Sequence, residues 1–166
     1  MCVLSGPGTK TTNLYGQFVM PGLVESHTHA LWGACRDLFD VYVGYNATFE
    51  MLIDAVRTRL KQLAPGDFIY GGPWRLDMRG AMGNDPKLVL DNISTTHPII
   101  LADSSQHIIW CNSKALDAAG LVRDVADIPG GGIERTSNGA PNGILAESAG
   151  APVRALLTRS DSQLAK

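Results

Sequence analysis

The 166-residue sequence has no apolar run that approaches the roughly 20 residues needed to cross a membrane. It also lacks the clustered lysine and arginine residues of a nucleic-acid-binding surface, and its formal net charge is only −2. Its first residues do not combine a basic start with an apolar block, so no signal peptide is predicted. These absences predict a protein whose partners include neither nucleic acid nor a membrane.

Cysteine is scarce as well, with three residues that are widely spaced: Cys2, Cys35 and Cys111. Because no Cys-x-x-Cys pair occurs and the number is odd, the sequence favours neither a zinc knuckle nor a disulfide framework. Free thiols fit a reducing compartment, and we expect a cytoplasmic protein. Cys35 follows His29 closely enough to suggest a metal-ligand role, but we favour burial as a small apolar side chain.

The most informative feature that is present spans residues 19–30, Val-Met-Pro-Gly-Leu-Val-Glu-Ser-His-Thr-His-Ala. If Leu23–His27 is a strand, alternate side chains share a face, so His27 and His29 point the same way at its end. Two neighbouring neutral imidazoles can hold one divalent metal ion, most often zinc. The alternative is a pair of polar residues in a loop.

Residues 21–29 resemble the first-strand motif of the amidohydrolase superfamily, with Glu25 where many members have aspartate. A second series extends the resemblance from about Gly16 to Glu147. It comprises Asp103-x-x-x-His107, Asn112-Ser113-Lys114-Ala115-Leu116, Ala119-Gly120-Leu121, Gly131-Gly132-Ile133-Glu134-Arg135, Gly139–Leu145 and Glu147. This ordered series is similar to one branch of the superfamily, whose members hydrolyse N-substituted amides and formamides.

The resemblance implies an α/β fold, a partial (β/α)8 TIM-type barrel preceded by the remnant of a small N-terminal β-sandwich. Residues 1–20 would be that remnant, and residues 21–166 the N-terminal part of the barrel with inserted segments. A complete barrel takes about 250 residues, so 166 residues are too few for one. We therefore expect an N-terminal portion of a larger enzyme, one that is inactive alone and exposes sheet edges that a homo-oligomer could cover.

The resemblance also assigns roles to particular residues. It implies that His27 and His29 ligate the metal, and that Glu147 reaches the same ion or bridges two. A glutamate favoured by the dipole at a helix start is the alternative for Glu147. His107 would contact substrate or stabilise a developing oxyanion, and the alternative is a histidine bonded to backbone. The family's two later histidine ligands and its last-strand aspartate have no counterpart here.

The implied chemistry is hydrolysis of a carbon–nitrogen bond in a small, non-peptide amide. In the family, metal-bound hydroxide attacks the carbonyl, and a carboxylate moves the proton to the leaving amine. Two alternatives remain. One is a metal-dependent phosphoesterase, which also opens with His-x-His, although the second series argues against it. The other is a non-enzymatic remnant in which the histidine pair binds metal weakly or not at all.

Elsewhere the pattern predicts ordinary structural elements. The 3.6-residue periodicity of apolar side chains predicts a helix over 48–63 with Thr48 as its N-cap. The remaining expected elements are a turn and short strand at 15–20, strands at 67–74 and 98–103, short helices at 85–91 and 113–119, a hairpin over 132–145 and a last helix near Pro152. We expect the hairpin to turn at Ser137-Asn138-Gly139 and Asn112 to cap the helix at 113–119. We also expect structural roles for Trp74, Trp110 and His97, and a carboxylate partner for Arg135.

Overall fold

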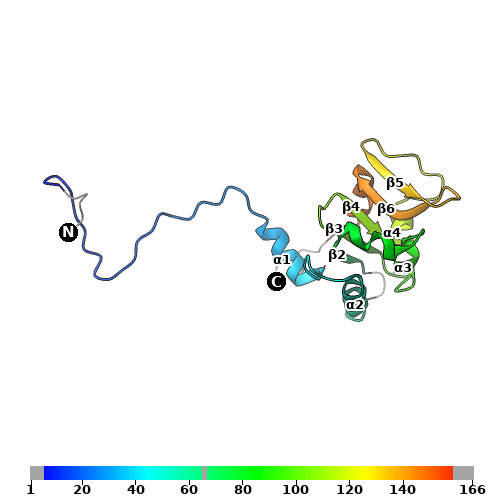
Figure 1. The fold of residues 1–166 in the computed structure, drawn as a ribbon, viewed down its shortest axis with the longest axis horizontal. Helices are drawn as coiled ribbons and strands as arrows, with labels where there is room; N and C mark the ends of the chain where they lie inside the picture. Colours follow the sequence, from blue (N-terminus) through cyan, green and yellow to red (C-terminus); the bar gives the residue numbers. More distant parts are fainter. Residues whose placement is uncertain (1–5, 65–66, 159–166) are drawn as a thin grey trace.

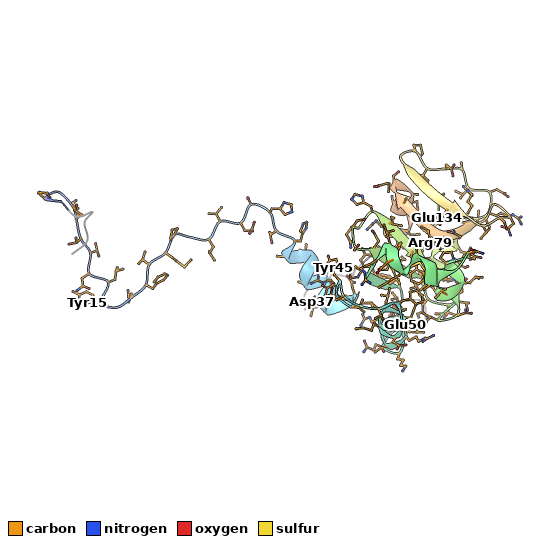
Figure 2. All side chains as sticks on the ribbon, in the orientation of Figure 1. Tyr15, Asp37, Tyr45, Glu50, Arg79 and Glu134 are labelled. Atoms are coloured by element: carbon orange, nitrogen blue, oxygen red, sulfur yellow. The ribbon has the colours of Figure 1, made fainter. Side chains whose placement is uncertain are left out.

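The computed structural model describes residues 6–64 and 67–158, apart from the side chain of Trp32. Six strands form one mixed sheet in the order β1-β2-β3-β4-β6-β5 (Figure 1). Their bounds are β1 Val41–Tyr42, β2 Ile69–Trp74, β3 Ile99–Asp103, β4 Ile108–Cys111, β5 Gly131–Arg135 and β6 Pro141–Glu147. The predicted strands at 67–74 and 98–103 and the hairpin over 132–145 are confirmed.

Strand direction brings several strand ends to one side of the sheet. β1, β2 and β3 run parallel, β4 is antiparallel to β3, and β6 is antiparallel to β4. β6 therefore runs in the same direction as β3, and the carboxyl ends of β1, β2, β3 and β6 share one edge. We call this the carboxyl edge. In α/β folds with parallel strands, binding and catalytic groups gather at such an edge.

Helices cover both faces of the sheet. They are α1 Ala30–Phe39, α2 Phe49–Leu60, η1 Leu76–Met82, α3 Lys87–Asp91, α4 Ser113–Ala118, η2 Ser148–Gly150 and α5 Ala151–Arg154. The predicted cap of α2 is confirmed, because the Thr48 side chain accepts a hydrogen bond from Met51 N at 3.3 Å. The helix ends at Leu60, a turn earlier than expected, and Pro65 and Gly66 lie outside the described residues. No described helix is both long and apolar enough to cross a membrane.

Two apolar layers form because successive side chains of a strand point to opposite faces. Ile99 and Leu101 belong to the layer beneath α2, η1 and α3, whereas Ile100 and Ala102 belong to the layer beneath α4 and α5. β4 and β6 divide in the same way, with Trp110 and Ile144 in the first layer and Ile109 and Leu145 in the second. β3 and β4 are thereby buried on both sides and give the carboxyl edge a rigid support.

Residues 6–29 form an extended segment that reaches away from the sheet and joins it through α1 (Figure 1). The expected strand at Leu23–His27 is wrong for this structure, since Leu23 and Val24 are 91% and 92% exposed and the segment pairs with no described strand. At 15–20 the turn is present, at Tyr15 and Gly16, but no strand follows it. A short strand gains little stability without hydrogen-bond partners, so local sequence pattern is insufficient here.

A mixed α/β architecture with a six-stranded sheet is thus confirmed, while its place in a larger barrel stays a prediction. So does the division into residues 1–20 and 21–166. The two outer strands of the described sheet are β1 and β5.

Candidate metal and hydrolytic site

The two histidines of the His-x-His motif lie together immediately before α1. Their Nε2 atoms are 3.1 Å apart, and their ring centroids are 5.0 Å apart with a 75° angle between the planes. Short-range hydrogen bonds shape the backbone here: His27 N donates to Glu25 Oε1 at 2.8 Å, and Ala30 N donates to Thr28 Oγ1 at 3.2 Å. A local turn therefore brings the two rings together, and not the alternating side-chain directions of a β-strand.

This pairing fits two ligands of one divalent ion. Two nitrogens bound to zinc at about 2.0–2.1 Å in a tetrahedral arrangement lie roughly 3.3 Å apart. The observed Nε2–Nε2 separation of 3.1 Å is close to that value, and both side chains are exposed, so an ion could reach them. Among residues 6–64 and 67–158, however, no three His, Cys, Asp or Glu side chains are grouped to hold a metal. Among the described residues the site therefore consists of two histidines, and its binding of a metal stays a prediction.

The other two predicted site residues also meet, at the carboxyl edge. Strand pairing sets Ile108 of β4 opposite Ala146 of β6, which places His107 beside Glu147. His107 Nδ1 lies 3.0 Å from Glu147 Oε2, and Glu147 N donates to the His107 carbonyl at 2.8 Å. Both side chains remain accessible, with exposed fractions of 65% and 59%. The alternative for His107, a histidine bonded to backbone, does not describe its ring, which contacts a carboxylate. Its contact with substrate stays a prediction.

The structure forms two pairs and does not bring all four residues into one cluster. His27 and His29 are together, His107 and Glu147 are together, and the described residues contain no metal-binding group that includes Glu147 with the histidine pair. Ligation by Glu147 stays a prediction. Glu147 directly precedes the three-residue 3-10 helix η2, and its side chain makes no cap hydrogen bond there. With a φ of 53°, Glu147 also has a backbone conformation that is uncommon for a residue other than glycine.

The carboxylate of Glu147 raises the pKa of His107 above its usual value of 6.5, first through the hydrogen bond and then through its charge. The Asp103 charge adds to this effect, whereas partial desolvation and the Arg154 charge oppose it. We expect the NMR titration midpoint of His107 to lie above 6.5 and to fall in Glu147→Gln, which removes the negative charge. His97, which is outside this pair, provides the internal control. An unchanged midpoint in the variant would contradict the pairing.

The sign of the linked stability effect follows from the raised pKa. The pairing contributes to stability fully below the unfolded-state pKa near 6.5, and this contribution is lost as pH rises through the folded-state pKa. Because the pair is exposed, salt should weaken the effect.

Trp74, Trp110 and His97, which were predicted to be structural, make structural contacts. Trp74 and Trp110 are buried, and their ring N–H groups donate to the carbonyls of Leu101 and Pro86. His97 contacts the Ala64 carbonyl through Nε2 at 3.1 Å and Ser94 Oγ through Nδ1 at 3.0 Å.

The structure also places Arg135 and two of the cysteines, Cys35 and Cys111. Arg135 has the expected carboxylate partner, Asp127, at 3.0 Å. Cys111 is buried, and burial raises the pKa of its thiol, which keeps it protonated and unreactive. Cys35 is only partly buried, and no described group of metal-binding side chains includes it.

Two residues at the carboxyl edge received no role from the sequence. Asp103, the last residue of β3, is 2% exposed and accepts hydrogen bonds from the loop that carries His107. Arg154 of α5 donates to the Gln106 carbonyl in the same loop at 2.6 Å. An aspartate followed two residues later by a serine, directly after a buried strand, is a typical turn signal that could have identified Asp103.

Comparison with known proteins assigns the chain to a family. A sequence model described as "Amidohydrolase family" matches residues 10–166, which is nearly the whole chain. The chain belongs to the amidohydrolase family. This confirms the superfamily that the Pro21–His29 motif indicates, and it gives no support to the phosphoesterase alternative.

Curated relatives match most of this chain. Protein LONG AFTER FAR-RED 3 of Arabidopsis thaliana is 32% identical over 87% of the chain and 24% of its own length. N-substituted formamide deformylase of Arthrobacter pascens is 27% identical over 87% of the chain and 27% of its own length. The chain thus spans about a quarter of the length of these curated relatives.

A solved structure shows the fold. The crystal structure of an uncharacterized metal-dependent hydrolase from Pyrococcus furiosus matches with a TM-score of 0.54 and 22% identity, over 86% of this chain and 26% of that one. At that identity the likeness concerns the arrangement of helices and strands and carries no residue-level role.

Proposed function

We propose that the chain contributes a two-histidine metal half-site to a hydrolase that cleaves carbon–nitrogen bonds in small, non-peptide amides. The observation that carries the proposal is the 3.1 Å separation of the Nε2 atoms of His27 and His29, in a chain of the amidohydrolase family. Zinc is the proposed metal, because paired imidazoles suit it. The similarity to a formamide deformylase supports an N-substituted amide as the substrate class.

Each pair of residues has its own task in this proposal. His27 and His29 would hold the ion. A bound divalent ion of this kind lowers the pKa of water and polarises a carbonyl group. His107 lies at the carboxyl edge, where its ring can contact the substrate and hydrogen-bond to a developing oxyanion when it is protonated. Glu147 favours that protonated form by its charge, and we keep it as a candidate third ligand.

The proposed setting is a (β/α)8 barrel to which this sheet contributes its first strands. Three observations support it: β1, β2 and β3 are parallel, helices lie along the sheet, and the fold resembles that of a metal-dependent hydrolase. Glu147 at the end of β6 and the His107 loop after β3 share the carboxyl edge, as catalytic groups do in barrels. The cytoplasmic location and an oligomeric state remain predictions.

Zinc binding by the purified, untagged chain tests the proposal most directly. We expect about one zinc ion per chain, with both histidines contributing. Removal of both ligands in His27→Ala/His29→Ala should weaken binding at least as much as the roughly 10–100-fold loss that follows removal of an outer-shell partner. Equilibrium competition with a chromogenic chelator would measure the affinity, and elemental analysis would measure the stoichiometry.

His97→Gln is the matched control, because His97 is bonded to Ser94 and Ala64 and belongs to neither histidine site, so its loss should leave the zinc affinity unchanged. Absence of zinc from the wild-type chain, or equal affinity in the double variant, would contradict the half-site. Turnover of N-substituted formamides, with a phosphomonoester as the contrasting substrate, would test the bond class. Weak zinc binding, or none, would favour the non-enzymatic alternative. Lack of turnover by this chain alone would not, because we expect the chain to be inactive alone.

A further inference from the structure

We propose that Asp103 is a positioning residue for His107. Its buried carboxylate shapes the loop that holds His107 Nδ1 against Glu147, and this leaves Nε2 as the basic nitrogen of the neutral ring. The inference deepens the proposed function and rests on it, because it concerns how His107 would meet a substrate.

The Asp103 carboxylate is held within its own loop. Oδ2 accepts hydrogen bonds from Ser105 N at 3.1 Å and from Ser105 Oγ at 2.6 Å, and Oδ1 accepts one from Ile108 N at 2.9 Å. A carboxylate that is 2% exposed is costly unless donors compensate its charge, and these three do so. The loop between β3 and β4 is therefore built around Asp103.

The same loop fixes the backbone of His107 on two sides. Ser105 Oγ, which donates to Asp103, accepts a hydrogen bond from His107 N at 3.3 Å. On the other side, the His107 carbonyl accepts a hydrogen bond from Glu147 N at 2.8 Å. Arg154 anchors the loop from α5 through the Gln106 carbonyl. The ring of His107 thus meets Glu147 from a backbone that Asp103 and Arg154 hold in place.

The partner of Nδ1 determines where the proton of neutral His107 lies. An ionised carboxylate only accepts hydrogen bonds, so at 3.0 Å from Glu147 Oε2 the Nδ1 atom must carry the proton. Nε2 then has the lone pair of the neutral ring. Carboxylates orient catalytic and metal-binding histidines in the same manner. Since the side chain is 65% exposed, Nε2 can take up a proton at the carboxyl edge and, once protonated, donate a hydrogen bond to a developing oxyanion as proposed above.

Nitrogen-15 NMR of the histidine rings tests this without metal or substrate. At a pH where His107 is neutral, we expect Nδ1 to have the shift of a protonated nitrogen and Nε2 that of an unprotonated one. His107→Gln assigns the signals among the four histidines. Ser105→Ala and Asp103→Asn should each shift both nitrogens toward the averaged values of a ring that exchanges between tautomers. Ser105→Ala should have the smaller effect, because the carboxylate and its bond to Ile108 N remain.

Asp91→Asn is the matched control, since Asp91 also accepts hydrogen bonds from a serine N and Oγ, those of Ser113 at 2.9 and 2.7 Å. It should leave the His107 signals unchanged. A wild-type Nε2–H tautomer, or unchanged signals in both loop variants, would overturn the proposal. Ser105 is exposed, so Ser105→Ala still decides the question if Asp103→Asn does not fold. Zinc affinity of the His27/His29 pair is measured separately, so a failed half-site and a failed Asp103 role are distinguishable.

Discussion

Replacement of Asn112 with alanine is expected to lower the free energy of unfolding by about 3–5 kcal/mol, the upper range for a single substitution. Asn112 is fully buried and joins three parts of the chain. Its Oδ1 accepts hydrogen bonds from Ile99 N and Ala115 N, both at 3.0 Å. Its Nδ2 donates to the carbonyls of Ser94 and His97, both at 2.9 Å.

The size of the effect follows from what alanine leaves behind. Two backbone N–H groups and two carbonyls lose a partner inside the protein, and each buried unsatisfied group costs roughly 1–3 kcal/mol before relaxation or water entry reduces the sum. The substitution also removes the N-cap of α4, which alone is worth about 0.5–2 kcal/mol. The cap predicted from the sequence is therefore only part of what Asn112 does.

Urea unfolding monitored by circular dichroism would measure this loss. Asn92→Ala, at the exposed end of α3, is the matched control and should change stability by less than about 0.5 kcal/mol. Asn112→Asp retains the Oδ1 acceptor but loses both donors, so it should be destabilising as well. An Asn112→Ala variant as stable as Asn92→Ala would show that the four bonds contribute little.

Sequence pattern predicted the elements whose signals are local. The α2 periodicity, the Thr48 and Asn112 caps and the Asn138-Gly139 turn each depend on a few neighbouring residues, and the structure contains all of them. The Leu23–His27 strand failed because strand formation depends on a neighbour that local sequence does not specify. His27 and His29 nevertheless meet, through a turn stabilised by Glu25 and Thr28.

The candidate site shows the same limit. His107 and Glu147 are 40 residues apart, and only the antiparallel register of β4 and β6 brings them into contact. The family resemblance indicated both residues as site candidates, but it gave no sign that the two would pair with each other. Asp103 belongs to the same motif as His107 but received no role for a related reason, since its role depends on burial and on a loop geometry that composition does not reveal.

The β4–β6 register also depends on Gly143, which allows β6 to pack closely against its neighbours. Substitution of this glycine should therefore lower the free energy of unfolding strongly. Gly143→Ala is expected to cost about 2–6 kcal/mol, as the sum of backbone strain and overpacking. Gly143 has a φ of 95°, and a Cβ atom there would lie 2.3 Å from the Cys111 carbonyl oxygen and 2.9 Å from Lys87 Cβ. Backbone of β4 and the first turn of α3 would have to move to admit it.

Gly139→Ala separates the two contributions, because Gly139 has a similar φ of 84° but no atom within 4 Å of an added Cβ. It should carry only the strain of roughly 1–3 kcal/mol. Equal destabilisation in the two variants, measured by thermal and urea unfolding, would mean that the close approach to Cys111 costs nothing.

If the approach is costly, β6 should shift in Gly143→Ala, and the contact of His107 with Glu147 four residues further along should weaken with it. The raised titration midpoint of His107 would then fall in Gly143→Ala and stay unchanged in Gly139→Ala, which would connect the packing of the sheet to the chemistry at its carboxyl edge.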